Sequence, residues 1–253
     1  MKLNFLAAGR LRMKKRIYIP GADRSEMIDL PVSSALIQHR QGNVLFDTGC
    51  HPSVVDHAEE RWGALARAMK PIMSADETLL PNLACVGLGP DDIDVVVNSH
   101  LHTDHCGCNQ FFKKATIIAH AKEVEAASGP DAEAAGYFRA DWAGDRPIET
   151  VTGERDLFGD GRVVLLPLPG HTPGTIGARV SLDRDGEFLL ASDAISLRQS
   201  LDTNTAPRNT WNAEVLLKSF EEVRRIEKSA ATVICGHDDR QWQSLRKGNE
   251  GYE

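Results

Sequence analysis

The sequence predicts a single layered α/β domain that spans residues 1–253. Short apolar runs of strand length alternate along the chain with segments of helical spacing, which is the pattern of helices packed on sheets. The chain contains no internal repeat, no low-complexity segment and no linker rich in proline, glycine and serine that would divide it. With 42% hydrophobic residues, a chain of 253 residues is long enough to bury a sizeable core.

Strands are predicted where short, mostly apolar runs are bounded by turn residues or charges. The first two are joined at Gln41-Gly42-Asn43, which is a plausible hairpin turn. The later runs are almost continuously apolar and are therefore typical of buried strands. In chain order, the predicted strands are residues 32–38, 44–47, 93–98, 116–119, 163–168, 187–191 and 232–235.

Helices are predicted where apolar residues recur every three or four positions. Residues 58–70 have this spacing and end at Pro71, which cannot continue a helix. A second helix is predicted at 122–127, and a longer amphipathic one at 213–228, which Asn212 would cap. The charged, glycine-containing residues 154–161 are interpreted as a loop, and the basic run 10–16 as a solvated loop or a strand edge.

Charge and cysteine content exclude several classes of protein. The formal net charge of −7 argues against nucleic-acid binding, because phosphate neutralisation needs a basic surface. No stretch approaches about 20 apolar residues, so no membrane partner is expected. The five cysteines lack zinc-finger spacing, and the first residues lack the pattern of a signal peptide. We therefore expect a cytoplasmic protein whose cysteines are reduced. We also expect it to be a monomer or a homodimer.

The residues that point most directly to chemistry lie after the apolar run at 93–98. Three imidazoles and a carboxylate occur within six positions: His100, His102, Asp104 and His105. Imidazole and carboxylate are the usual ligands of zinc, iron, manganese and cobalt. Crowded buried histidines would repel one another if protonated and would lack partners if neutral, and a metal ion removes both problems. The run therefore predicts a metal site rather than a set of ordinary loop side chains.

Three further candidate ligands each follow an apolar strand: His171, Asp193 and His237. In layered α/β folds, the loops at one end of the sheet build the site. Seven ligands are too many for one tetrahedral ion, but they suit two ions about 3.5–4 Å apart that share a carboxylate. Asp193 is the expected bridge, because a carboxylate offers two oxygens. We expect two divalent ions, with zinc favoured and iron, manganese or cobalt left open.

Taken together, these motifs resemble those of the metallo-β-lactamase superfamily. The resemblance rests on the H-x-H-x-D-H run, on G-H-T-P-G at 170–174, on S-D-A at 192–194, on the later Gly-His, and on the upstream turn F-D-T-G at 46–49. It implies a four-layer αββα sandwich with the metals at one edge of the sheets. It also implies the ligand sets: His100, His102 and His171 for one ion, Asp104, His105 and His237 for the other, with Asp193 between them. Asp47 is implied as a partner that orients a ligand by hydrogen bonding.

Within the superfamily, the chain most resembles the N-acyl-homoserine lactonases and related small-lactone hydrolases, over nearly its whole length. The flanking matches are at residues 28–32, 89–94 and 235–238. Antibiotic-degrading members generally have a cysteine where this chain has Asp193. Two positions depart from the lactonases. Ser196 stands where they commonly have a tyrosine near the substrate, and Thr103 where they often have an aromatic residue. Both are predicted substrate-contacting positions, with smaller and more polar side chains.

The resemblance implies hydrolysis of an N-acyl-homoserine lactone, a quorum signal, by a hydroxide that bridges the two metals. Asp104 would pass the proton from the attacking water to the leaving ring oxygen. The same metal centre would also serve another lactone of the pyridoxolactone type, an aryl ester or a phosphotriester, so these small-molecule substrates remain alternatives. A metal-holding protein without turnover is a further alternative. A structural zinc site is usually four-coordinate and closed, whereas a shared two-metal site holds water, which favours an enzyme.

Overall fold

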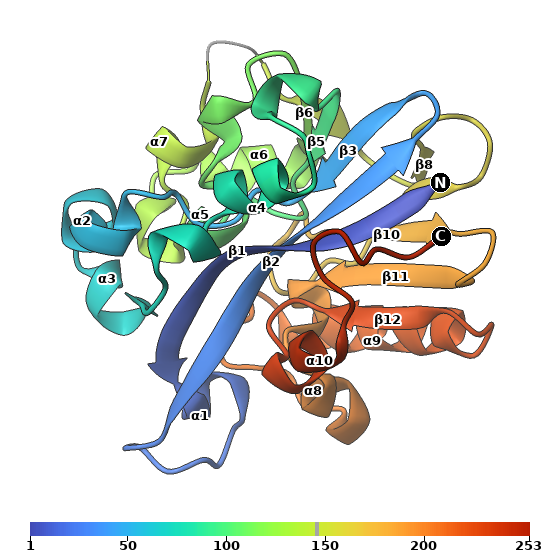
Figure 1. Ribbon diagram of the computed structural model, residues 1–253. Helices are drawn as coiled ribbons and strands as arrows, with labels where there is room; N and C mark the ends of the chain where they lie inside the picture. Colours follow the sequence, from blue (N-terminus) through green and yellow to red (C-terminus); the bar gives the residue numbers. More distant parts are fainter. Residues whose placement is uncertain (145–146) are drawn as a thin grey trace.

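The computed structural model describes residues 1–144 and 147–253, and its strands form two sheets packed face to face (Figure 1). The larger sheet has seven strands in the order β4-β1-β2-β3-β5-β6-β7. Neighbouring strands from β4 to β3 are antiparallel, and those from β3 to β7 are parallel. In sheet order, these strands are Lys70–Pro71, Lys2–Lys14, Met27–His39, Gly42–Phe46, Val95–Val97, Thr116–His120 and Glu149–Val151.

The second sheet has five strands in the order β12-β11-β10-β9-β8. Because β11 and β12 are parallel and β10 is antiparallel to both β9 and β11, strands β9, β11 and β12 all run in one direction. Their carboxyl ends therefore lie at the same edge of the sheet. In sheet order, the strands are Thr232–Cys235, Glu187–Ser192, Ile176–Ser181, Val163–Pro167 and Arg155–Asp156.

Four clusters of buried apolar side chains hold these sheets and their helices together, one of which packs α6 and α7 against β6. Between the sheets, side chains such as Phe46 and Val97 pack against Leu165 and Leu190. The outer face of the seven-stranded sheet packs against α2, α3 and α4, and that of the five-stranded sheet packs against α9. The predicted αββα sandwich is confirmed. The helices are α1 Lys15–Tyr18, α2 Val54–Trp62, α3 Leu65–Ala68, α4 Leu79–Cys85, α5 Thr103–Cys106, α6 Ala121–Ala127, α7 Arg139–Trp142, α8 Arg198–Thr203, α9 Ala213–Glu227 and α10 Asp239–Ser244.

Each predicted strand is present, with ends that differ by a few residues, and β12 has the predicted bounds. The helix predicted at 213–228 is α9, and the Asn212 side chain accepts a hydrogen bond from the Val215 amide, as a cap does. The helix predicted at 58–70 is wrong as a single element. Gly63, with a φ of 53°, ends α2, and a short α3 and strand β4 follow. The loop predicted at 154–161 also contains the short strand β8.

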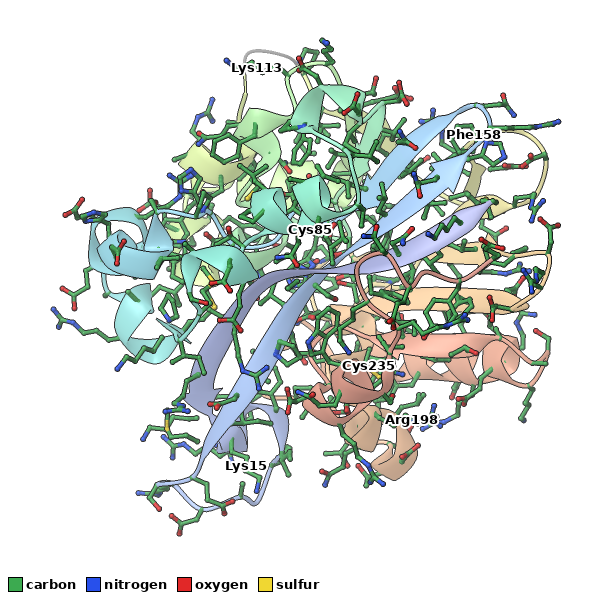
Figure 2. The ribbon with its side chains drawn as sticks, in the orientation of Figure 1. Lys15, Cys85, Lys113, Phe158, Arg198 and Cys235 are labelled. Atoms are coloured by element: carbon green, nitrogen blue, oxygen red, sulfur yellow. The ribbon has the colours of Figure 1, made fainter. Side chains whose placement is uncertain are left out.

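Strands β1, β4, β7 and β10 were not predicted from the sequence. β1 pairs with β2 over most of its length, and it contains the first part of the basic run 10–16. Figures 1 and 2 show this end of the β1–β2 pair, with α1 and Lys15, projecting from the rest of the molecule. Within the described residues, no helix is long and apolar enough to cross a membrane.

Candidate metal centre

The seven candidate ligands come from the ends of strands in both sheets. The segment with His100 to His105 follows β5 of the larger sheet, while His171, Asp193 and His237 follow β9, β11 and β12. Figure 2 labels Cys235, the last residue of β12, two positions before His237. Since these strand ends meet where the two sheets face each other, residues up to 137 positions apart in the chain form one cluster.

The ligand atoms form two groups that share no residue, and Asp193 lies between them in a third group with His100 and His105. In the first group, His102 Nδ1 lies 3.1 Å from both His100 Nε2 and His171 Nε2. In the second, Asp104 Oδ2 lies 3.6 Å from both His105 Nε2 and His237 Nε2.

Asp193 faces both groups with different oxygens. Its Oδ2 lies 3.4 Å from His171 Nε2, and its Oδ1 lies 3.0 Å from His237 Nε2. Oδ1 also lies 3.7 Å from His105 Nε2. The structure thus brings all seven predicted ligands together and places the carboxylate between the two groups.

The arrangement fits divalent ions better than hydrogen bonding. His105 Nε2, His237 Nε2 and Asp193 Oδ1 are buried without a hydrogen-bond partner among the described residues. Orphaned buried polar atoms are costly, and a metal ion would satisfy them. Metal–nitrogen bonds of about 2.0–2.1 Å at tetrahedral angles separate ligand atoms by about 3.3 Å. The observed separations of 3.0–3.7 Å are close to that value.

Burial and charge prepare these side chains for ligation. Burial lowers the pKa of His102 and of His171 to about 4, so both imidazoles are neutral with a lone pair to donate. Burial opposes protonation of His105 as well, but Asp104, Asp47 and Asp193 together raise its pKa to about 10. The carboxylates thus favour positive charge at the second group, which is the charge that a cation would bring.

Asp47 orients a ligand of the second group through its carboxylate. Its carboxylate accepts hydrogen bonds from the Ser99 amide at 2.7 Å and from the Ser99 hydroxyl at 2.8 Å, and lies 2.9 Å from His105 Nδ1. That contact fixes the ring so that Nε2 faces Asp104 and Asp193. Asp47 has a φ of 63°, and Ser192, directly before Asp193, has a φ of 47°. Such strained backbone persists where the surroundings impose it, often at functional sites.

Glu123 of α6 is a positioning side chain that the sequence did not reveal. It is fully buried and links the two loops that carry the first ligand group. Its Oε1 accepts from the Leu101 amide at 3.0 Å, and its Oε2 accepts from the Thr172 hydroxyl at 2.6 Å and the Gly174 amide at 3.0 Å. Burial raises the pKa of Glu123, and none of these donors is cationic. Leu101 and Thr172 are each the immediate neighbour of a candidate ligand, so Glu123 sets how the two loops approach each other.

The two predicted substrate-contacting residues are buried. The Thr103 hydroxyl donates to Asp141, which pairs with Arg61. The Ser196 hydroxyl lies 3.5 Å from the Asp193 carbonyl, and its own carbonyl accepts from the His237 amide at 2.8 Å. Neither residue lines the cavity beside the metal centre. Their hydroxyls thus support neighbouring residues in this structure, and substrate contact by Ser196 and Thr103 stays a prediction.

A cavity of about 600 Å³ opens beside the first ligand group, and His102 and His171 form part of its wall. The Tyr137 ring packs 4.9 Å from the His102 ring between centroids and lines the same cavity. On the other side of the centre, the buried Tyr18 ring packs edge-on against His237 with centroids 6.4 Å apart. Tyr18 could not be predicted as a neighbour of the site, because it lies about 80 positions before the metal run.

An αββα sandwich with clustered histidine and aspartate ligands at one sheet edge defines a class of protein that uses divalent metal ions. The model of the metallo-β-lactamase superfamily matches residues 27–237, and the chain belongs to that superfamily.

Similar proteins share nearly the whole chain. An N-acyl homoserine lactonase AiiB from Agrobacterium fabrum is 34% identical, over 99% of this chain and 98% of the relative. An N-acyl homoserine lactonase AttM from Azorhizobium caulinodans is 30% identical, over 100% of this chain and 99% of the relative. The solved structure of an N-acyl homoserine lactone hydrolase, with the product N-hexanoyl-L-homoserine bound at its catalytic metal centre, has a TM-score of 0.89 and 27% identity. That match covers 99% of this chain and 98% of the other.

Proposed function

We propose that this protein is a dinuclear metal-dependent hydrolase that opens the ring of N-acyl homoserine lactones, as a single metallo-hydrolase domain spanning residues 1–253. The observation that carries the proposal is the pair of ligand groups with Asp193 between them. The lactonases among its relatives support the substrate class. Turnover is favoured over a purely structural metal site because a shared two-metal centre leaves positions for water.

His100, His102 and His171 would hold one ion, and Asp104, His105 and His237 the other, with Asp193 shared. Two divalent ions, which we propose to be zinc with iron, manganese or cobalt as alternatives, would lower the pKa of a water and polarise the lactone carbonyl. Asp47 would keep His105 in the orientation that ligation needs, through the contact at its Nδ1.

Asp104 is proposed as the proton carrier. Its Oδ2 faces His105 and His237, which leaves Oδ1 to take a proton from the attacking water and to pass it to the leaving ring oxygen. The carboxylate is nearly buried, so bulk water does not compete for that proton. The ring-opened product then has a carboxylate, which contains the carbonyl oxygen and the water oxygen, and a hydroxyl, which contains the former ring oxygen.

Ring opening releases a proton, so it can be followed with a pH indicator on protein of known metal content. We expect hydrolysis of N-hexanoyl homoserine lactone, its loss with a chelator, and its return with added zinc. Asp104→Asn should lower kcat about 10²–10⁴-fold, while Asp56→Asn, on an exposed turn of α2, should leave kcat unchanged. Hydrolysis of aryl esters or phosphotriesters by metal-loaded protein that leaves homoserine lactones intact would refute the substrate assignment. An Asp104→Asn variant with full activity would refute the proton-carrier role.

We also propose that the protein acts in the cytoplasm as a monomer or a homodimer. All five cysteines lie in the described part of the chain and are free thiols, which suits a reducing compartment. Light scattering on a size-exclusion column would determine the oligomeric state, and a higher oligomer would contradict this proposal.

A further inference from the structure

Three short helices meet beside the second ligand group: α2, α5 and α7 (Figure 1). α5 has four residues and carries two candidate ligands, Asp104 and His105. A helix of four residues is not stable by itself, because nucleation costs more than its few hydrogen bonds return. Contacts with other elements must therefore fix the direction in which its side chains point.

The end of α5 is held through its backbone. The His105 carbonyl accepts a hydrogen bond from the Thr48 amide at 2.7 Å, and the Gly107 amide donates to the Gly49 carbonyl at 2.8 Å. Thr48 and Gly49 follow β3, so this end of α5 is tied to the larger sheet. A single anchored end does not fix how the first residues of the helix are oriented.

The start of α5 is held through a side chain. Thr103, its first residue, is buried and stands between the candidate ligands His102 and Asp104. Its hydroxyl donates to Oδ2 of Asp141, whose side chain is fully buried on α7. A hydrogen bond is directional, so this contact sets the rotation of α5, which apolar packing alone leaves free.

Arg61 of α2 holds the other oxygen of the same carboxylate. Its Nε donates to Asp141 Oδ1 at 2.7 Å, and its Nη2 donates to the Ala140 carbonyl at 3.4 Å. The Arg61 side chain is itself only 16% exposed. Burial and the nearby carboxylate of Asp104 raise the pKa of Asp141, and Arg61 supplies the counter-charge that opposes both. Asp141 is therefore a fixed acceptor, because a second helix holds it in place.

The carboxylate of Asp104 depends on this arrangement. Within residues 1–144 and 147–253, no hydrogen bond to the Asp104 side chain forms, and its ion-pair contacts are with His105 and His237, each 3.6 Å from Oδ2. The backbone of α5 is then what places this carboxylate. The contact between Thr103 and Asp141 lies one residue before it, so a change there reaches Asp104 directly.

We propose that Asp141, fixed by Arg61, is a positioning residue that acts through the Thr103 hydroxyl to orient the ligands on α5. The inference rests on the proposed metal-dependent function and adds to it the residues that keep the second ligand group in place. It gives Thr103 a role in which its hydroxyl faces the protein, whereas substrate contact needs a side chain that faces the cavity. The two roles predict different results for the same variant.

The first test removes the hydroxyl and then restores it. Thr103→Val keeps the branched shape without the hydroxyl, and Thr103→Ser keeps the hydroxyl without the methyl group. The visible absorption of protein loaded with cobalt(II) reports the geometry of the ligands around each ion. We expect Thr103→Val to weaken binding of one of the two ions about 10–100-fold and to change its cobalt absorption. Thr103→Ser should restore both.

Thr78→Val is the matched control. Thr78 is also buried, and its hydroxyl donates to the Ala75 carbonyl at 2.6 Å, directly before α4. Its loss should lower stability but leave metal affinity and the cobalt absorption unchanged. If Thr103→Val likewise lowers stability alone, Thr103 has only a structural role and the inference is overturned.

Steady-state kinetics separate positioning from substrate contact. With both ions at saturating concentration, Thr103→Val should lower kcat for N-hexanoyl homoserine lactone about 10–100-fold and change KM little, because it disturbs the metal site and leaves the cavity intact. A raised KM with unchanged kcat and unchanged cobalt absorption would show direct substrate contact and overturn the inference.

Asp141→Asn tests whether the hydroxyl acts through this carboxylate. The amide keeps the size of the side chain and removes its charge, which weakens a charge-assisted hydrogen bond. If the two residues act through their contact, the double variant of Thr103→Val and Asp141→Asn should bind metal no more weakly than the weaker of the single variants. Losses that multiply in the double variant would overturn the inference.

Metal binding needs no lactone, so these measurements also separate the inference from the proposed function. Loss of metal affinity in Thr103→Val, in a protein that opens no lactone, would support the positioning role and refute the proposed function. Ring opening by a Thr103→Val variant that keeps the metal affinity, cobalt absorption and kcat of the wild type would support the function and refute the positioning role.

Discussion

Replacement of Glu123 by glutamine tests whether a buried carboxylate outside the ligand set controls the metal site. The wild-type carboxylate accepts hydrogen bonds from Leu101, Thr172 and Gly174, and the Tyr137 side chain also interacts with it. The amide of glutamine has one oxygen. If that oxygen keeps the Thr172 and Gly174 bonds, the amide nitrogen faces the Leu101 N–H, donor against donor. One bond is lost and one buried N–H is left without a partner.

The expected loss of stability in Glu123→Gln can be estimated from those contacts. A hydrogen bond to a charged group contributes about 1.5–3 kcal/mol, and a buried donor without a partner costs about 1–3 kcal/mol. Burial raises the pKa of Glu123, which shows that the ionised form is costly where it lies, so the neutral amide recovers part of this loss. We expect the free energy of unfolding to fall by about 2–3 kcal/mol. Because Leu101 and Thr172 adjoin His100, His102 and His171, zinc affinity should fall about 10–100-fold.

Competition with a chromogenic chelator measures the zinc affinity, and urea unfolding of the same zinc-loaded samples measures stability. Glu125→Gln is the matched control, because Glu125 lies exposed on the same helix and should change neither quantity. Thr172→Val removes one donor and keeps the charge, so it should weaken zinc binding less than Glu123→Gln. If Glu123→Gln lowers stability but binds zinc within about twofold of wild type, Glu123 serves the fold alone and the reasoning fails.

Two further predictions concern the metal centre itself. A Cβ on Gly236 would lie 2.3 Å from Asp193 Oδ1, so Gly236→Ala should displace the shared carboxylate and lower the amount of bound metal. Gly153→Ala is the control and should keep its metal, because a Cβ on Gly153 meets nothing within 4 Å. Equal metal content of the two variants, measured by mass spectrometry, would contradict this prediction. Removal of the metals leaves His105, His237 and Asp193 with unpaired buried atoms, so the melting temperature should fall with a chelator and return with zinc. At a free zinc concentration of 100 times Kd, binding adds about 2.7 kcal/mol to the free energy of unfolding. A melting temperature that the chelator leaves unchanged would count against metal occupancy.

The candidate ligands could be predicted because each can be identified from its immediate neighbours in the sequence. His100, His171, Asp193 and His237 each stand a few positions after an apolar run that becomes a strand, and the topology brings those strand ends to one edge. Residue type then restricts the chemistry, since imidazoles and carboxylates in that number have few roles other than metal binding. The division into two groups came from the resemblance, and the distances around Asp193 agree with it.

Several elements escaped prediction because their patterns are ambiguous over short windows. β1 mixes basic and apolar residues, and its pairing with β2, which is not visible in its own sequence, determines its conformation. β10 follows the His171 turn, with Gly177 placed where a Cβ would approach the Leu190 carbonyl within 2.9 Å, and a glycine in a strand weakens the strand pattern. The interruption between α2 and α3 is only two residues long, Gly63 and Ala64, in a region of otherwise helical spacing.

The side chains that would contact a substrate could not be predicted from the sequence, for a different reason. Thr103 and Ser196 were predicted as substrate contacts from positions in a motif, but a motif does not give side-chain direction, and both hydroxyls face buried neighbours. The cavity beside the first ligand group is lined instead by residues within 126–137, 171–173 and 208–211, which follow no periodic pattern. Alanine and an isolated tryptophan resemble ordinary helix and loop residues until the fold brings them into the same cavity as His102 and His171. The candidate ligands are therefore encoded locally, at strand ends, whereas the walls of the cavity beside them depend on contacts that only the folded chain creates.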